Sequence, residues 1–127
     1  NERYIRQTMI PEIGEAGQEK LKNAKVLIVG IGGLGSPISL YLTAAGVGQI
    51  GLIDDDIVSS SNLQRQILYT EAEIGQSKVE CACRRLSALN SSTRFETYPN
   101  RFTSDNADRL VSTISLSTDA TMLLPVI

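Results

Sequence analysis

Residues 25–56 read KVLIVGIGGLGSPISLYLTAAGVGQIGLIDDD, and this stretch decides the fold. It begins with the apolar run 26–29, whose length and composition are typical of a strand buried on both faces. A glycine-rich turn follows, and apolar residues near helical spacing predict a helix over 36–45. A second apolar run, 50–53, predicts another strand. The stretch therefore predicts a unit of strand, helix and strand.

The turn has the pattern G-x-G-x-x-G, formed by Gly30, Gly32 and Gly35. Glycine lets the backbone turn tightly and approach a ligand, and the helix behind it directs free N–H groups at an anion. Asp54 follows the second strand, where nucleotide-binding units carry the acid that accepts ribose hydroxyls. These residues predict a nucleotide site, which an NAD-dependent oxidoreductase domain would also have. The alternative is a turn whose glycines only let a helix pack on a strand.

Composition limits the class of protein. The chain has 127 residues, a hydrophobic content of 42% and a formal charge of −2, which suit one domain or part of one. It has no dense run of Lys or Arg, so we expect no nucleic-acid binding. It contains no histidine, which excludes Ser-His-Asp catalysis, Cys-His catalysis and His-ligated zinc within this chain.

The long apolar stretch does not predict a membrane helix. Residues 26–53 carry no charged side chain and exceed the roughly 20 residues that span a bilayer. Their repeated glycines and Pro37 would weaken a single helix, whereas strand, turn, helix and strand account for all of them. We therefore expect no membrane association. The chain opens with charged residues and shows no signal peptide, so we expect a cytoplasmic protein.

The chain divides into an N-terminal helical segment, 1–24, and a nucleotide-binding half. The segment predicts two short helices, 2–8 and 14–23, separated near Pro11. It either covers an edge of the sheet or contacts a second copy of the chain and carries Arg6 toward the neighbour's site.

The nucleotide-binding half comprises residues 25–127. Beyond the opening unit it predicts a helix over 77–90, a strand over 95–99, a helix over 104–111 and a strand over 114–116. The alternation predicts an α/β fold: a Rossmann-like, doubly wound, mainly parallel sheet with helices on both faces.

Two cations follow the second strand. Asn62 could begin a helical turn that presents Arg65 and Gln66 together. Arg65 is placed to reach phosphates at the glycine turn, because ligands of open α/β sheets lie outside the strand ends. A solvated loop arginine fits the spacing equally well. Lys78 lies in the first turn of its helix, where a cation opposes the helix dipole and hints at an anionic partner, although a solvated lysine is the ordinary explanation.

Taken together, these motifs closely resemble the ThiF/MoeB/HesA family, the bacterial relatives of ubiquitin-activating enzymes. The resemblance spans about residues 3–110 and rests on RYIRQ, GxGGLG, D-x-D, SNLQRQ and G-x-x-K. This combination is far more specific than the glycine pattern alone. The run DDD after the second strand and the run QILYTEAEI favour ThiF over MoeB.

The resemblance implies a homodimeric, ATP-using adenylyltransferase. Its substrate would be the C-terminal Gly-Gly carboxylate of a small ubiquitin-like sulfur-carrier protein of the ThiS or MoaD type, in thiamine or molybdopterin biosynthesis. The reaction would form an acyl-adenylate and release pyrophosphate.

The resemblance also assigns the site, position by position. It places nucleotide binding at Gly30, Gly32, Gly33, Gly35, Asp54, Asp56, Ser61, Asn62, Leu63, Gln64, Arg65 and Lys78. It assigns catalysis to Arg65, Lys78, Asp119 and, in trans from the second subunit, Arg6. Asp119 is the candidate ligand for Mg²⁺.

The C-terminal end departs from the family. Residues 112–127 are shorter than the strand and helix expected there, and Ala120 stands where the family has Asn. The carrier-binding strands, the C-x-x-C pairs for a structural zinc and the sulfur-transfer cysteine belong to a later half that this sequence does not contain. We therefore expect a truncated chain that is inactive alone. A non-catalytic fragment that retains the fold is the remaining alternative.

Overall fold

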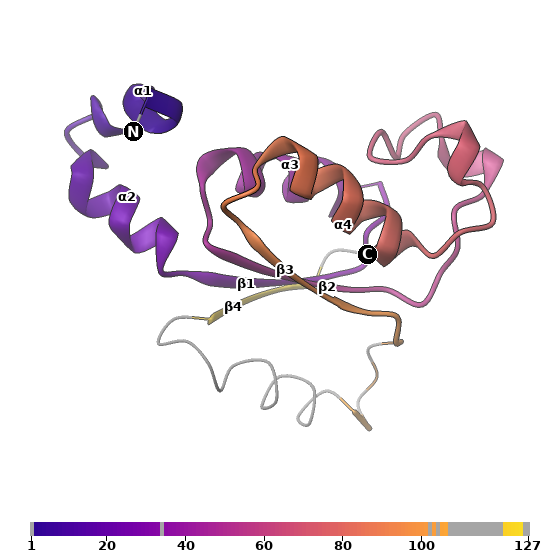
Figure 1. Cartoon of the computed structure of the whole chain (residues 1–127). Helices are drawn as coiled ribbons and strands as arrows, with labels where there is room; N and C mark the ends of the chain where they lie inside the picture. The colour runs from indigo at the N-terminus through magenta and orange to yellow at the C-terminus, as the bar shows by residue number, and fades with distance from the viewer. Residues whose placement is uncertain (1, 34, 102, 104, 107–120, 126–127) are drawn as a thin grey trace.

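The computed structural model describes residues 2–33, 35–101, 103, 105–106 and 121–125 (Figure 1). A parallel sheet organises them, with strands in the order β3-β2-β1-β4. The strands are β1 (Lys25–Val29), β2 (Gln49–Ile53), β3 (Arg94–Tyr98) and β4 (Thr121–Pro125). The α/β class and the parallel sheet are confirmed. β4 lies beyond the strand predicted at 114–116, and that segment and most of the helix predicted at 104–111 fall outside the described residues.

Two helices cover one face of the sheet, α3 (Gly35–Ala45) and α4 (Lys78–Leu89), as Figure 1 shows. Each connects neighbouring parallel strands, first β1 to β2 and then β2 to β3. Because both crossovers are expected to be right-handed and move in the same direction along the sheet, their helices fall on the same face. The described residues leave the helices predicted on the other face untested.

β1 is buried on both faces, as its apolar run predicts. Val26 and Ile28 belong to the main core, which also contains apolar side chains of β2 and α4. Leu27, between them, faces the other way because side chains alternate along a strand, and it packs with Ile53 in a smaller cluster. The sheet therefore has a core on each side, and its ends are the surfaces left for a site.

The N-terminal segment lies against the amino end of the sheet. It comprises a 3₁₀ turn (Glu2–Tyr4), α1 (Ile5–Thr8) and α2 (Gly14–Lys22), which confirms both predicted helices. The Gly48 N–H donates to the Leu21 carbonyl at 3.0 Å, and the side-chain amides of Gln7 and Gln18 donate to the Ala45 carbonyl, each at 3.1 Å. Within one chain this segment covers an end of the sheet.

No helix in the described part of the chain combines the length and the apolar character needed to cross a membrane.

Candidate functional site

The glycine turn lies at the carboxyl end of β1, and its glycines differ in what requires them. Gly30 has a φ of 90°, a backbone conformation that favours glycine. A Cβ atom at Gly35 would lie 2.0 Å from the Gly30 carbonyl oxygen, so Gly35 is required by packing between the turn and α3. At Gly32 and Gly33, a Cβ atom would meet only ordinary contacts, at 3.5 Å and 3.6 Å. Gly32 and Gly33 are therefore not required by packing, and without a Cβ atom their backbone can be approached closely by a ligand.

Arg65 reaches the glycine turn, as its place after β2 predicts. The nearest atom to a Cβ built on Gly33 is Arg65 Cδ, at 3.6 Å. The guanidinium Nη1 donates to the Ser61 carbonyl at 3.3 Å, and the side chain is otherwise exposed. An exposed, anchored guanidinium beside a glycine turn can bind an anion.

The other residues of SNLQRQ have local or packing roles. The segment begins with a 3₁₀ turn (Ser60–Asn62), in which Asn62 Oδ1 accepts the hydroxyl of Ser59 at 2.8 Å. Leu63 packs against the main core, whereas Ser61 and Gln64 are exposed. The predicted contacts of this segment with a nucleotide stay predictions.

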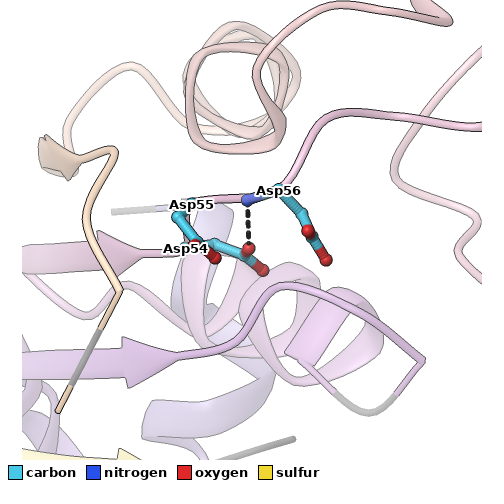
Figure 2. Close-up of side chains that lie close together, drawn as sticks. All are labelled: Asp54, Asp55 and Asp56. Atoms are coloured by element: carbon cyan, nitrogen blue, oxygen red, sulfur yellow. Dashed lines mark hydrogen bonds between the residues drawn. The ribbon is translucent and has the colours of Figure 1, made fainter.

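The acidic run after β2, drawn in Figure 2, contacts the glycine turn through Asp54 and exposes Asp55 and Asp56 to solvent. Asp54 Oδ2 accepts the Ile31 N–H at 2.7 Å, and Oδ1 accepts the Asp56 N–H at 2.8 Å. Carboxylate oxygens of Asp54, Asp55 and Asp56 lie within 4.8 Å of one another. A carboxylate has four lone-pair sites, so both oxygens of Asp54 can still accept ribose hydroxyls.

Lys78 is buried, which rules out the solvated lysine. It is the first residue of α4 and is 4% exposed, and its ammonium lies 3.7 Å from Asp56 Oδ2. Its N–H donates to the Asp56 carbonyl at 3.1 Å. Lys78 therefore places a cation at the same acidic run that holds the glycine turn.

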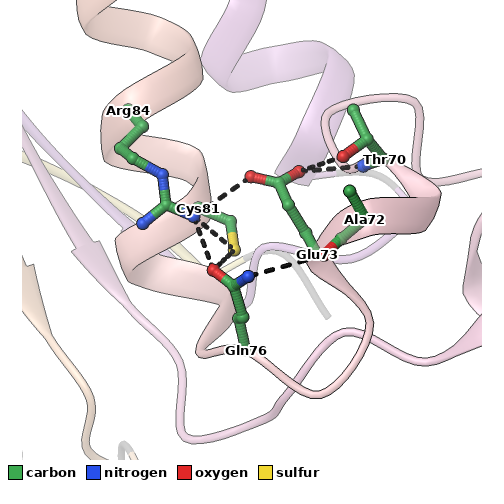
Figure 3. Close-up of polar contacts among 6 residues, drawn as sticks. All are labelled: Thr70, Ala72, Glu73, Gln76, Cys81 and Arg84. Atoms are coloured by element: carbon green, nitrogen blue, oxygen red, sulfur yellow. Dashed lines mark hydrogen bonds and ion pairs between the residues drawn. The ribbon is translucent and has the colours of Figure 1, made fainter.

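A polar network anchors the loop that leads to Lys78 (Figure 3). In a 3₁₀ turn (Glu71–Glu73), Glu73 accepts the Thr70 N–H at 2.9 Å, and its other oxygen pairs with Arg84 Nη2 at 3.3 Å. Arg84 also donates to Gln76 Oε1 at 2.7 Å. Burial alone would raise the pKa of Glu73, but hydrogen bonds from Thr70, then Cys81 and then Arg84 outweigh burial and lower it.

Cys81 completes this network and is unsuited to nucleophilic catalysis. Its sulfur lies 3.4 Å from Arg84 Nη2, and the side chain is fully buried. Burial raises the pKa of the thiol, and Glu73 raises it further, so the thiolate is disfavoured.

Sequence reasoning missed Tyr69. It is 5% exposed, and its hydroxyl donates to the Ile31 carbonyl at 2.6 Å. Gln66, expected to be presented with Arg65, is instead buried, with its amide 3.5 Å from a Cβ built on Gly32. Burial, and then the charge of Asp54, raise the pKa of Tyr69 and keep its hydroxyl protonated as a donor. The sequence offers one indication of this role: a tyrosine in an apolar segment needs a hydrogen-bond partner for its hydroxyl.

One predicted catalytic residue, Arg6, does not join this site within a single chain, and the position of another, Asp119, is not described. Arg6 is exposed on α1, at the amino end of the sheet, whereas the glycine turn lies at the carboxyl end (Figure 1). Asp119 lies outside the described residues.

Comparisons with known proteins agree with this architecture. A family model described as "ThiF family" matches residues 4–122. The sulfur carrier protein adenylyltransferase of Thermus thermophilus is 48% identical over 124 residues, which cover 98% of this chain and 46% of that protein.

Solved structures give the same result. The tRNA N6-threonylcarbamoyladenosine dehydratase TcdA of E. coli, in complex with AMP, aligns with a TM-score of 0.85 and 28% identity over 96% of this chain and 48% of its own. E. coli MccB with ATP aligns with a TM-score of 0.74 and 36% identity over 82% of this chain and 32% of its own. This chain spans less than half the length of each of these relatives. It belongs to the ThiF family.

Proposed function

We propose that the full-length protein containing this chain uses ATP to adenylate the C-terminal Gly-Gly carboxylate of a small ubiquitin-like sulfur-carrier protein, of the ThiS or MoaD type, and releases pyrophosphate. The observation that carries the proposal is the side chain of Arg65 packed beside Gly33 of the glycine turn, with its guanidinium exposed. The name of the Thermus thermophilus relative supports the carrier as substrate.

The reaction fits a site without histidine. The attacking carboxylate is already an anion, so attack on the α-phosphorus needs no general base. The obstacle is repulsion between this anion and the phosphates, which cations and oriented N–H groups reduce. Arg65 is positioned to bind phosphate oxygens, and Lys78 would do so by exchanging its partner Asp56 for the nucleotide.

The site also suits a divalent cation. Three carboxylates whose oxygens lie within 4.8 Å of one another, Asp54, Asp55 and Asp56, offer the hard oxygen ligands that Mg²⁺ prefers. Bound Mg²⁺ would neutralise charge on the phosphate oxygens. Asp119 stays a predicted ligand on the strength of the family resemblance.

The proposal includes a homodimer. The helix that carries Arg6, α1, lies at the amino end of the sheet and the glycine turn at the carboxyl end, so a contribution from Arg6 requires a second copy. Two apolar side chains close to Arg6 in sequence, Ile5 and Met9, are 52% and 69% exposed. They leave apolar surface near Arg6 for that contact.

Carrier-dependent exchange of labelled pyrophosphate into ATP tests the function. The full-length protein should catalyse exchange only with a carrier that ends in Gly-Gly, and Arg65→Ala should reduce the rate by about 10² to 10³, as expected for loss of a preorganised charge contact. Arg85→Ala removes another exposed arginine, on α4, and is the matched control that should retain the rate. Unchanged exchange in Arg65→Ala would reject the role of Arg65, and no exchange in the wild-type protein would reject the function.

A further inference from the structure

The direction of the N–H groups in the glycine turn is fixed by hydrogen bonds to the neighbouring carbonyls. A trans peptide places its C=O and the following N–H on opposite sides. The Gly32 carbonyl accepts the Ser36 N–H at 2.9 Å, which directs the Gly33 N–H away from α3. The Ile31 carbonyl accepts the Tyr69 hydroxyl at 2.6 Å, which directs the Gly32 N–H away from Tyr69. These two bonds therefore fix the directions of the Gly32 and Gly33 N–H groups.

Ile31 is held on both sides by side chains distant in sequence. Its N–H donates to Asp54 at 2.7 Å and its carbonyl accepts from Tyr69, while its own side chain is fully buried. The turn is glycine-rich, so its peptide planes would otherwise rotate at little steric cost. None of the described residues accepts a hydrogen bond from the Gly32 N–H. That donor is free and oriented, and it belongs to the residue before Gly33, beside which Arg65 packs.

We propose that Tyr69 is a positioning residue for the nucleotide: its hydroxyl fixes the 31–32 peptide so that the Gly32 N–H donates to a phosphate oxygen of ATP. The inference rests on the proposed use of ATP and adds a residue that never touches the ligand. Without the hydroxyl, the buried Ile31 carbonyl loses its donor, and a rotated peptide turns the Gly32 N–H away from the phosphate.

Tyr69→Phe in the full-length protein tests the proposal because it removes one hydroxyl and keeps the ring. We expect the Kd for Mg-ATP, measured by equilibrium titration, and the KM for ATP to rise about tenfold, as for loss of a hydrogen bond to a charged group. We expect kcat at saturating ATP to stay within about twofold, because the other contacts still hold the bound nucleotide.

Thr93→Val is the matched control. The Thr93 hydroxyl is also buried and also donates to a backbone carbonyl, that of Val47 at 2.8 Å, but at the amino end of the sheet. This variant loses the same kind of bond and should bind ATP like the wild type. An unchanged Kd in Tyr69→Phe, or an equal rise in both variants, overturns the positioning role.

A second variant covers the case in which Tyr69→Phe does not fold. Gly32→Ala places a methyl group 3.5 Å from the Gln66 amide, an ordinary contact, and so should fold with an unchanged Tm. It should weaken ATP binding about tenfold, because the methyl group crowds the N–H that the phosphate approaches. Unchanged binding overturns the proposal. Wild-type protein that binds ATP but exchanges no pyrophosphate rejects the adenylation function alone, whereas wild-type protein that does not bind ATP rejects both.

Discussion

Packing requires glycine at both ends of the sheet, at Gly48 and at Gly35, but it does not require the two further glycines of the carboxyl-end turn. At the amino end, a Cβ atom on Gly48 would lie 1.8 Å from the Lys22 carbonyl oxygen, because the chain leaving α2 passes directly over it. At the carboxyl end, Gly32 and Gly33 have room for a Cβ atom and still carry none. The first glycine lets the protein contact itself, and the other two leave a surface where something else can approach.

The polar groups follow the same division. At the amino end, side chains satisfy backbone groups of the fold, as Gln7 and Gln18 do for the Ala45 carbonyl. At the carboxyl end, Asp54 and Tyr69 hold the backbone of Ile31, and the exposed Arg65 lies beside the turn. At the amino end the polar side chains serve the fold, beside a cavity of about 340 Å³ that Gln18 and Gly48 line, whereas at the carboxyl end they hold a turn beside which Arg65 stays exposed.

The largest expected effect is a loss of stability at the amino end of the sheet. Gly48→Ala forces the α2 to β1 connection to move, because the clashing atom is backbone, and should lower the free energy of unfolding by about 3 kcal/mol. Urea denaturation measures this change. The folded fraction should bind Mg-ATP with wild-type affinity because the glycine turn is at the other end. A loss of less than about 0.5 kcal/mol would show that the close approach is not as described.

The same substitution at Gly33 tests the carboxyl end of the sheet. Gly33→Ala adds a methyl group beside the Arg65 side chain at 3.6 Å, and the free energy of unfolding should stay within about 0.5 kcal/mol of wild type. The Kd for Mg-ATP should rise about tenfold, because the methyl group occupies surface that the phosphate approaches. If Gly33→Ala costs more than about 1 kcal/mol of unfolding free energy, or leaves the Kd for Mg-ATP unchanged, the contrast between Gly48 and Gly33 is wrong.

The smallest effect concerns the network that anchors the Lys78 loop. Arg84 is 57% exposed and pairs with Glu73, so Arg84→Gln should cost about 0.5 kcal/mol of unfolding free energy at pH 7. The folded pKa of Glu73 is lowered, so its stabilisation is complete above the unfolded glutamate pKa of about 4.3 and is lost as pH falls through the folded pKa. The difference from wild type should therefore shrink toward zero in acid.

Urea denaturation at pH 7 and near pH 3 measures this difference, with Arg85→Gln as the control because Arg85 is exposed on the same helix. A cost that is independent of pH would assign the effect of Arg84 to its contact with Gln76 instead of Glu73.

Local sequence patterns predicted the helices and strands better than they predicted which side chains contact one another. Arg65 was predicted to reach the glycine turn, because ligands of open α/β sheets lie outside the strand ends. Asp54 was predicted to accept ribose hydroxyls, and its bond to the Ile31 N–H was not predicted. The burial of Lys78 was not predictable, because it depends on how the loop before α4 folds back onto the strand end. The bond from Tyr69 to Ile31 joins residues 38 apart, and no short-range pattern encodes it.

The position of Arg6 marks another limit of sequence reasoning. The sequence allowed either a segment that covers the sheet edge or one that serves a neighbour, and the single chain establishes only the first. The family resemblance implies that Arg6 acts on the site of a second subunit. This role stays a prediction, because a single chain does not show which surfaces two subunits share.

The most direct test of the account is a comparison of nucleotides on the full-length protein by thermal unfolding. At about one hundred times the Kd, Mg-ATP should stabilise the fold by about 2.7 kcal/mol and raise the Tm accordingly, whereas NAD at the same concentration should leave the Tm unchanged. Protection by NAD and not by Mg-ATP, or by neither nucleotide, would contradict the proposal that the carboxyl end of the sheet binds ATP.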